Sequence, residues 1–237
     1  MVDYVDGLVS IIIPIRKGEN ISKLIASIYG STYSMVEVII VDEGKERSEQ
    51  RNIGINRTKG EFLLFADSDW ILTKWLIREC VDLMILCDSI YIPEEIITKG
   101  WFAKLRNWER QFYTGTAIDC VRFVRAKDCP RFNEELNGPE DADFDRRIKG
   151  KRAISRNVYH HKDGVGLLTY FKKKAYYSKS MKLYEQLHPG DRVLNPIYRC
   201  FWVFLENGKW KRFFRNPVMA IGVILIVFIR GIIYLRR

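Results

Sequence analysis

FLLFADSDWIL, residues 62–72, joins an apolar run to two aspartates that stand on either side of a serine. A short apolar run of this kind predicts a strand buried on both faces. An Asp-x-Asp at the carboxyl end of such a strand places two carboxylates at the edge of an α/β sheet where these folds bind ligands. Asp67 and Asp69, with Ser68 between them, are therefore predicted to hold a divalent cation and, through it, the phosphates of a nucleotide.

Two aspartates after a strand also occur as turn and helix-capping residues. Asp69 precedes WILTKW, where it could cap a helix. The motif alone leaves both interpretations open, and the order of the segments around it favours the chemical one.

Apolar runs precede this strand at regular intervals. LVSIIIP (8–14) and VEVIIVDEG (36–44) are predicted as buried strands, and ISKLIASIYG (21–30) and RSEQRNIGINRTKG (47–60) as helices. Three strands separated by two helices predict an α/β fold with a right-handed, mostly parallel sheet flanked by helices.

The later segments are less regular. They are predicted as an aromatic and basic helix, a half-exposed strand, a helix with acids at its positive end, and an edge strand ending in paired histidines: residues 101–114, 120–128, 138–150 and 153–164.

Charge divides the chain. The net charge of +10 combines −7 over residues 1–145, +11 over 146–182, −1 over 183–198 and +7 over 199–237. A basic region beside an apolar tail indicates an anionic lipid surface, and no nucleic-acid-binding motif is present. The five cysteines are odd in number and lack a CxxC pair, which predicts buried free thiols in a reducing compartment.

The tail is the most apolar segment. VMAIGVILIVFI (218–229), extended to Leu235, has 18 residues, about 27 Å as a helix against a hydrocarbon core of about 30 Å. We therefore predict a helix that spans or inserts into a membrane, with Arg230 snorkelling to the interface. Burial in a protein interface is one alternative. A helix in the membrane plane is another, disfavoured because the run has no polar face.

In this order, the motifs resemble the inverting family 2 glycosyltransferases with a GT-A (Rossmann-like) fold, including membrane-associated enzymes of polyprenyl- and dolichyl-linked glycans. The resemblance covers residues 8 to about 165 and is carried by VSIIIP, Glu19, VIIVDEG, RNIGI with KGEFLLFADSD, and GPEDADFDRRI.

The resemblance implies a donor site in the first half of the chain. Pro14 and Glu19 would line the nucleotide pocket, Asp42 would bind the base, and Arg51 would approach the ribose or phosphates. Asp67 would face the ribose and the metal, and Asp69 would ligate Mn²⁺ or Mg²⁺ directly.

The second half would supply the remaining groups. Asp141 would be the general base that deprotonates the acceptor hydroxyl, and Glu140 would raise the proton affinity of the pair. His160, or failing it His161, would contact the metal or the diphosphate; a structural role for these histidines is the alternative. The acids at 140–141 could also be helix caps.

The sequence departs from the family at two points. The usual Asp-Asp-Gly-Ser is here Asp42-Glu43-Gly44-Lys45, so contacts at its second and fourth positions do not carry over. The Gln-x-x-Arg-Trp signature of processive synthases is absent, which favours the addition of one sugar.

Together these features predict a catalytic domain over 1–165, aromatic and basic interfacial helices over 166–216, and a membrane helix over 217–237. The predicted reaction moves one hexose, with mannose as a candidate, from a UDP- or GDP-sugar to a hydroxyl of a polyprenyl- or dolichyl-linked acceptor at the cytoplasmic face of the cell membrane. The rivals are a polyprenyl-phosphate hexose synthase, a phosphatase of the haloacid dehalogenase type, and a nucleotide-binding scaffold without turnover.

Overall fold

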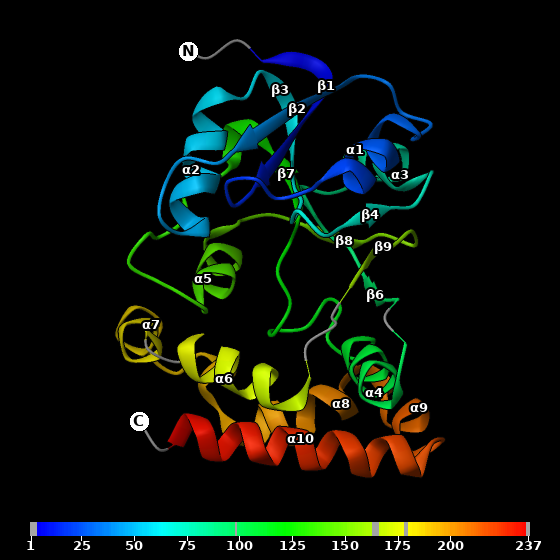
Figure 1. The fold of residues 1–237 in the computed structure, drawn as a ribbon, viewed down its shortest axis with the longest axis vertical. Helices are drawn as coiled ribbons and strands as arrows, with labels where there is room; N and C mark the ends of the chain where they lie inside the picture. Colours follow the sequence, from blue (N-terminus) through cyan, green and yellow to red (C-terminus); the bar gives the residue numbers. More distant parts are fainter. Residues whose placement is uncertain (1–3, 98, 163–165, 178–179, 236–237) are drawn as a thin grey trace.

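The computed structural model describes residues 4–97, 99–162, 166–177 and 180–235. An α/β half forms the upper part of Figure 1 and a helical half the lower part, with α10 along the bottom. The central sheet has six strands in the order β2-β1-β3-β7-β5-β8: Val36–Val41, Val5–Pro14, Gly60–Phe65, Phe123–Arg125, Ser89–Tyr91 and Arg152–Ile154. All but β7 run in one direction, so the predicted mostly parallel α/β sheet is confirmed.

Helices cover both faces of this sheet, as the apolar runs predict. Because side chains alternate along a strand, Ile11 and Ile13 of β1 pack with α1 (Ser22–Tyr29) and α3 (Leu76–Leu83). Ile12 faces the opposite side, which is covered by α2 (Arg47–Arg57) and α5 (Glu140–Arg147). Gly54 allows α2 to lie close to β1, because a Cβ there would stand 2.3 Å from Cγ2 of Ile12.

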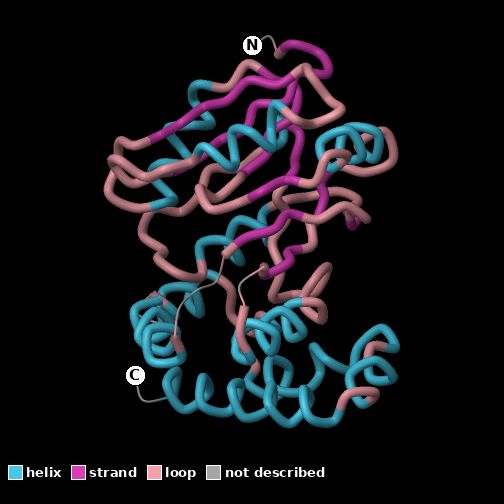
Figure 2. The backbone as a smooth tube through the Cα atoms, turned by 45° about the vertical axis from the view of Figure 1, so that its right-hand side comes forward, coloured by secondary structure: helices cyan, strands magenta, loops and turns pink. Residues whose placement is uncertain are grey.

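A small second sheet has the order β4-β9-β6: Ile71–Leu72, Tyr159–His161 and Glu94–Ile96. The labels of Figure 1 place it between the central sheet and the helical half, and Figure 2 shows that the strands lie above the helices of that half. The residues after Asp69 therefore enter a strand, and the next helix begins only at Leu76. The alternative in which Asp69 caps a helix is wrong, because β4 is fixed by its pairing with β9.

Aromatic and aliphatic side chains form the core of the helical half. The helices of this half are α4 (Trp101–Arg110), α6 (Leu167–Tyr177), α7 (Met181–Leu187), α8 (Val203–Leu205), α9 (Trp210–Phe214) and α10 (Pro217–Leu235). Three short turns lie between them: η2 (Arg192–Leu194), η3 (Tyr198–Trp202) and η4 (Glu206–Gly208). A further turn, η1 (Ala126–Asp128), follows β7. Helix α4 precedes α5 in the chain yet packs with the C-terminal helices. The domain boundaries proposed from sequence stay a prediction.

The prediction of a membrane-spanning tail is wrong. No helix within the described residues has the length and apolarity needed to cross a membrane. Instead α10 lies across α4 and α6, with Ala220, Val223 and Val227 buried between them.

Arg230 does not snorkel either. Its side chain is buried, and it donates to Glu109 and to the hydroxyls of Tyr113 and Tyr170. The reason is the fully buried carboxylate of Glu109: a buried charge is costly unless it is paired, and Arg230 supplies one of its partners.

All five cysteines are unpaired, as predicted. Cys80, Cys87 and Cys120 are buried, whereas Cys129 and Cys200 are half-buried.

Candidate active site

A cleft of about 630 Å³ lies at the carboxyl ends of β1, β2 and β3. Seven residues predicted from the sequence line it: Pro14, Glu19, Asp42, Asp67, Ser68, Asp69 and Glu140. They come together because parallel strands end at the same edge of a sheet, and because α5 presents its N-terminus to that edge.

The loops after β1 and β3 are joined inside this cleft. Glu19 accepts a hydrogen bond from the Ser68 hydroxyl at 2.6 Å and another from the backbone N–H of Arg16 at 2.9 Å. This contact fixes the Asp-x-Asp loop against the loop that follows β1.

Beside the cleft, three arginines hold two aspartates. Arg51, which is 1% exposed, donates to Asp141 Oδ1 at 2.7 Å and to Asp67 Oδ1 at 3.2 Å. Arg122 donates to Asp141 Oδ2 at 2.9 Å, and Arg47 stands 3.7 Å from Asp67 Oδ2. The Arg51 guanidinium thus bridges Asp141 and Asp67 of the Asp-x-Asp motif, although the Asp141 side chain does not line the cleft. We call these five residues the Asp141 cluster.

The neighbouring acids Asp141 and Glu140 have pKa values that are shifted in opposite directions. Burial would raise the pKa of Asp141, but Arg122 and Arg51 hold it well below its usual range. Burial also acts on Asp67, whose pKa is lowered by Arg47 and Arg51. The pKa of Glu140 is raised, first by burial and then by the charge of Asp141. Glu140 is therefore the stronger base of the pair, while Asp141 stays ionised.

The structure separates the paired histidines, because successive residues of a strand point to opposite faces. His161 Nδ1 lies 3.8 Å from Asp69 Oδ2, and its Nε2 lies 3.4 Å from Glu94 Oε2. His160 turns to Glu95, with its Nδ1 at 3.2 Å from Oε2. Of the two, only His161 adjoins the Asp-x-Asp motif. Burial alone would lower its pKa, but the nearby carboxylates of Asp69 and Glu94 raise it to about 9.

The residues present suit a magnesium or manganese ion that is held largely by a substrate. Asp69 has a carboxylate 49% exposed at the cleft, and Asp67 lies two residues away. No group of three or more potential His, Cys, Asp or Glu ligands occurs in the described part of the chain. A donor set of one or two carboxylates is what Mg²⁺ uses when phosphate oxygens and water complete its shell.

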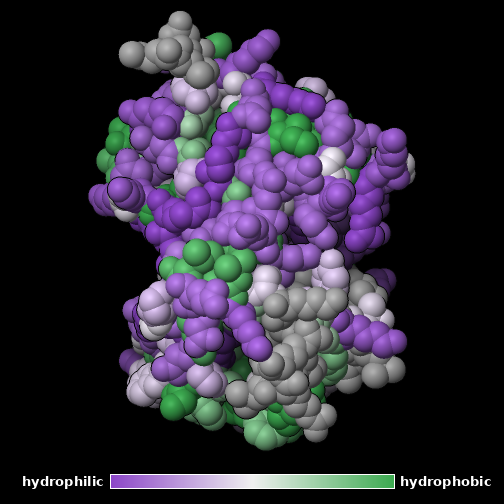
Figure 3. Space-filling view, turned by 90° about the vertical axis from the view of Figure 1, so that its left-hand side faces the viewer, coloured by the Kyte–Doolittle hydropathy of each residue, from purple (hydrophilic) through white to green (hydrophobic). Residues whose placement is uncertain are grey.

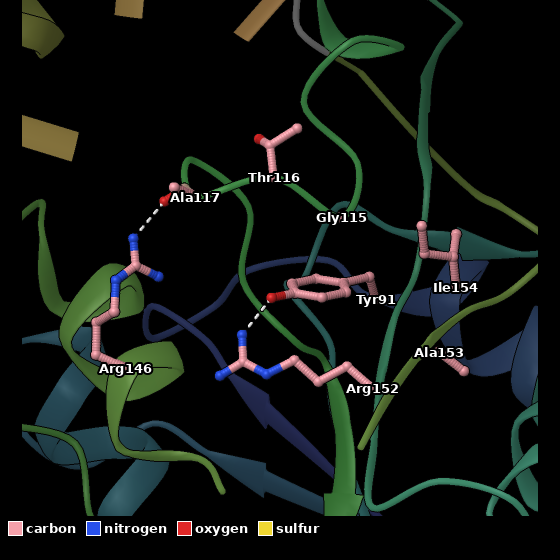
Figure 4. Close-up of a pocket in the computed structure, with 8 residues that line it drawn as sticks. All are labelled: Tyr91, Gly115, Thr116, Ala117, Arg146, Arg152, Ala153 and Ile154. Atoms are coloured by element: carbon pink, nitrogen blue, oxygen red, sulfur yellow. Dashed lines mark hydrogen bonds between the residues drawn. The ribbon is translucent and has the colours of Figure 1, made fainter. Parts of the chain in front are cut away.

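A second pocket, of about 570 Å³, lies at the ends of β5 and β8 (Figure 4). It contains none of the predicted site residues: its lining is Tyr91, Gly115, Thr116, Ala117, Arg146, Arg152, Ala153 and Ile154. Its two arginines already bind the buried carboxylates of Asp145 and Asp191. Both arginines are therefore engaged in ion pairs within the protein.

Sequence reasoning missed Arg122, Arg47 and Glu94. Arg122 reaches the cleft edge only because β7 runs antiparallel to β3 and so begins where β3 ends. Glu94 reaches His161 through the small second sheet. Strand pairing over such separations leaves no local signal, whereas Arg47 opens a predicted helix beside Asp42 and could have been found from its position.

No protein-family model matches this chain, and no curated protein sequence matches it. Solved structures do. TarS of S. aureus aligns with a TM-score of 0.53 and 16% identity, covering 86% of this chain and 44% of TarS. TarS 1–349 in complex with UDP aligns with a TM-score of 0.50 and 18% identity, covering 85% and 74%. The mannosyltransferase PcManGT from Pyrobaculum calidifontis, in complex with GDP-Man and Mn²⁺, aligns with a TM-score of 0.55 and 13% identity, covering 92% of this chain and 73% of PcManGT.

These likenesses show a fold of the glycosyltransferase kind, with a mostly parallel sheet flanked by helices. The chain spans less than half of the full TarS chain. At identities this low the likeness establishes the fold, and the chemistry must be argued from the cleft itself.

Proposed function

We propose that the protein is a metal-dependent inverting glycosyltransferase of the family 2 type that moves one hexose from a UDP- or GDP-sugar to a hydroxyl of a lipid-linked acceptor. The observation that carries this proposal is the cleft, where Asp42, Asp67, Asp69 and Glu140 meet at one edge of the sheet and Asp141 is tied to Asp67 through Arg51. The neighbours solved with UDP and with GDP-Man and Mn²⁺ support a nucleotide-sugar donor.

Each group at the cleft has a role in holding the donor. Asp42, at the end of β2, would accept a hydrogen bond from the nucleotide base. Arg47 and Arg51 would attract the diphosphate, since guanidinium groups bind phosphate in a forked geometry. Asp69, with Asp67 beside it, would hold Mn²⁺ or Mg²⁺, which neutralises the charge of the departing diphosphate when bound.

The acceptor hydroxyl must lose a proton as the new bond forms. Asp141 is a weak base while Arg51 and Arg122 bind it, because both lower its pKa. A donor diphosphate competes for Arg51, and the proton affinity of Asp141 rises as that guanidinium turns away. Glu140, with its raised pKa, is the adjacent acid that lines the cleft here. We propose Asp141 as the base, with the neighbouring charge of Glu140 raising its proton affinity.

The proposed acceptor and location are supported by the surface of the helical half. Its exposed apolar and basic surface supports a lipid-linked substrate, with polyprenyl or dolichyl chains as the candidates, at the cytoplasmic face of the cell membrane.

A lipid phosphate is the second candidate acceptor, favoured by the low pKa of Asp141. Such a nucleophile is already anionic and needs no base. Replacing Asp141 decides between the two reactions, as set out in the Discussion.

Thermal shifts with UDP- and GDP-sugars, with and without Mn²⁺, test the donor site. A ligand present at about one hundred times its Kd stabilises the folded state by about 2.7 kcal/mol. We expect one nucleotide class to raise the Tm in a Mn²⁺-dependent manner, and Asp42→Asn to weaken the shift. Ile85→Ser is the matched control, because Ile85 is 83% exposed and does not line the cleft. If no nucleotide sugar raises the Tm of the wild-type protein, the donor proposal fails.

A further inference from the structure

Helix α10 has one apolar face that no described residue covers. Along it, residues at intervals of three and four expose a continuous strip: Val218 is 66% exposed, Ile221 61%, Leu225 58%, Phe228 65% and Ile232 37%. These intervals place the five side chains on one side of the helix. We call this set the apolar strip. Figure 3 shows hydrophobic residues gathered at this lower end of the molecule, beneath the hydrophilic α/β half.

The opposite side of α10 is fixed to the protein. Val223 and Ile226 are buried in the helical core, and a Cβ at Gly222 would stand 3.0 Å from the Leu105 methyl groups of α4. Arg230 is anchored to Glu109 by a buried ion pair. Leaving this position would remove one of the two arginines that pair with the buried Glu109 carboxylate, which is costly, so the helix stays on α4 and presents the strip outward.

Aromatic side chains continue the exposed surface on the elements that pack beside α10. Phe201 and Trp202 of η3 are 52% and 57% exposed, and Trp210 and Phe214 of α9 are 50% and 61% exposed. Tryptophan and phenylalanine are typical of surfaces that lie at the boundary between water and acyl chains.

Basic groups accompany these aromatics. Lys211, Arg212 and Arg215 are exposed, and the Lys211 ammonium lies 5.7 Å from the Trp210 ring centre. Between residues 197 and 232 the one acid is Glu206, which is taken up by Tyr198 at 2.9 Å and Arg192 at 2.8 Å. The surface therefore combines exposed apolar side chains with an excess of basic over acidic residues in this segment.

We infer that α10 and α9 form a docking face for an anionic lipid bilayer, with α10 lying flat on the membrane. A second copy of this chain fits less well, because its own strip would bury apolar surface but offers Lys211, Arg212 and Arg215 no acid between residues 207 and 232. Anionic headgroups match that charge, and the acyl region accepts the strip. The inference deepens the membrane part of the proposed function by naming the surface and its orientation.

Vesicle flotation of the full chain tests the docking face. We expect binding to vesicles of phosphatidylcholine mixed with phosphatidylglycerol, weaker binding to phosphatidylcholine alone, and a loss of the difference at high salt. Leu225→Glu and Phe228→Glu should each reduce partitioning at least about tenfold, because each withdraws a large apolar side chain from the acyl region. Both positions are exposed, so circular dichroism should show an unchanged fold.

Ile85→Glu is the matched control. It places the same charge at an exposed apolar position in the α/β half and should leave partitioning unchanged. Lys211→Gln combined with Arg215→Gln should weaken binding only where phosphatidylglycerol is present.

Unchanged flotation of Leu225→Glu and Phe228→Glu would overturn the inference. So would a wild-type protein that ignores vesicles but forms a dimer which these substitutions dissociate. Donor-induced thermal shifts should persist in both variants, so failure of the docking face is distinguishable from failure of the donor site.

Discussion

Helix α5 carries two aspartates, four residues apart, that are each held by two arginines, and the two clusters differ in exposure. Asp141 binds Arg51 and Arg122 with its side chain 30% exposed. Asp145 binds Arg146 and Arg152 with its side chain 0% exposed. Asp145 also accepts from the Val121 N–H at 3.1 Å.

In the proposed function, this difference in exposure separates a catalytic cluster from a structural one. The Asp145 oxygens are occupied by protein donors on every side, so that aspartate and its arginines join α5 to β8 and to the segment before β7. The Asp141 cluster uses the same ion pairs next to a cleft, where the proposed donor diphosphate would exchange with a carboxylate as the partner of an arginine. Identical side chains therefore have different consequences, and substitutions can measure them.

Asp141→Asn should have the largest effect. Loss of the general base reduces turnover at least about a hundredfold, while the Tm stays within a few degrees because the site is partly solvated. Steady-state kinetics with Mn²⁺, donor and lipid acceptor measure it. Near-normal turnover would indicate a phosphate acceptor, and Glu140→Gln measured alongside shows which acid takes the proton.

Asp145→Asn should have the opposite effect: it should lower the stability of the fold and leave turnover unchanged. Removing one charge from a buried ion pair costs about 3–5 kcal/mol, and we expect about 2 kcal/mol because both arginines are about one quarter exposed. Urea denaturation measures the free energy of unfolding. Turnover per folded molecule should be retained; a loss equal to that of Asp141→Asn would erase the distinction between the two clusters.

Asp69→Asn should produce a smaller, metal-specific defect. Removal of a direct carboxylate ligand should weaken Mn²⁺ binding at least about tenfold, the lower end of the range seen for groups that merely orient ligands. The measurement is the Mn²⁺ concentration needed for half-maximal turnover. The matched variant is Asp82→Asn, an acid on α3 outside the cleft, which should show the wild-type metal requirement.

Glu109→Gln extends the comparison to a third carboxylate, which is fully buried like Asp145 and binds Arg106 and Arg230. Burial acts to raise the pKa of Glu109, but the arginines bring it to about 2 from its ordinary 4.5. A lowered pKa stabilises the fold above about pH 4.5, and that contribution disappears as the pH falls towards 2. The stability gap between wild type and variant should therefore shrink over this range in pH-dependent unfolding. A gap that is constant with pH would mean that Glu109 is not ionised.

The order of apolar runs was enough to predict the parallel sheet, its flanking helices and the edge at which Asp42, Asp67 and Asp69 meet. Each run carries its own period, and strands joined by helices have few topologies open to them. The same reasoning failed for α10, because a helix that is apolar on all sides has the same sequence pattern whether it spans a bilayer or packs on other helices. Arg230 gave no local sign of its buried partner Glu109, 121 residues earlier in the chain.

The sequence by itself determined the α/β layer and the position of its acidic motif, since both depend on residues close together in the chain. Only the tertiary structure decided that Arg122 holds Asp141, that His161 rather than His160 faces Asp69, and that α10 lies flat on α4. Those outcomes depend on pairings between distant segments, where the burial of charge and the direction of a strand are set by the partner that folding supplies.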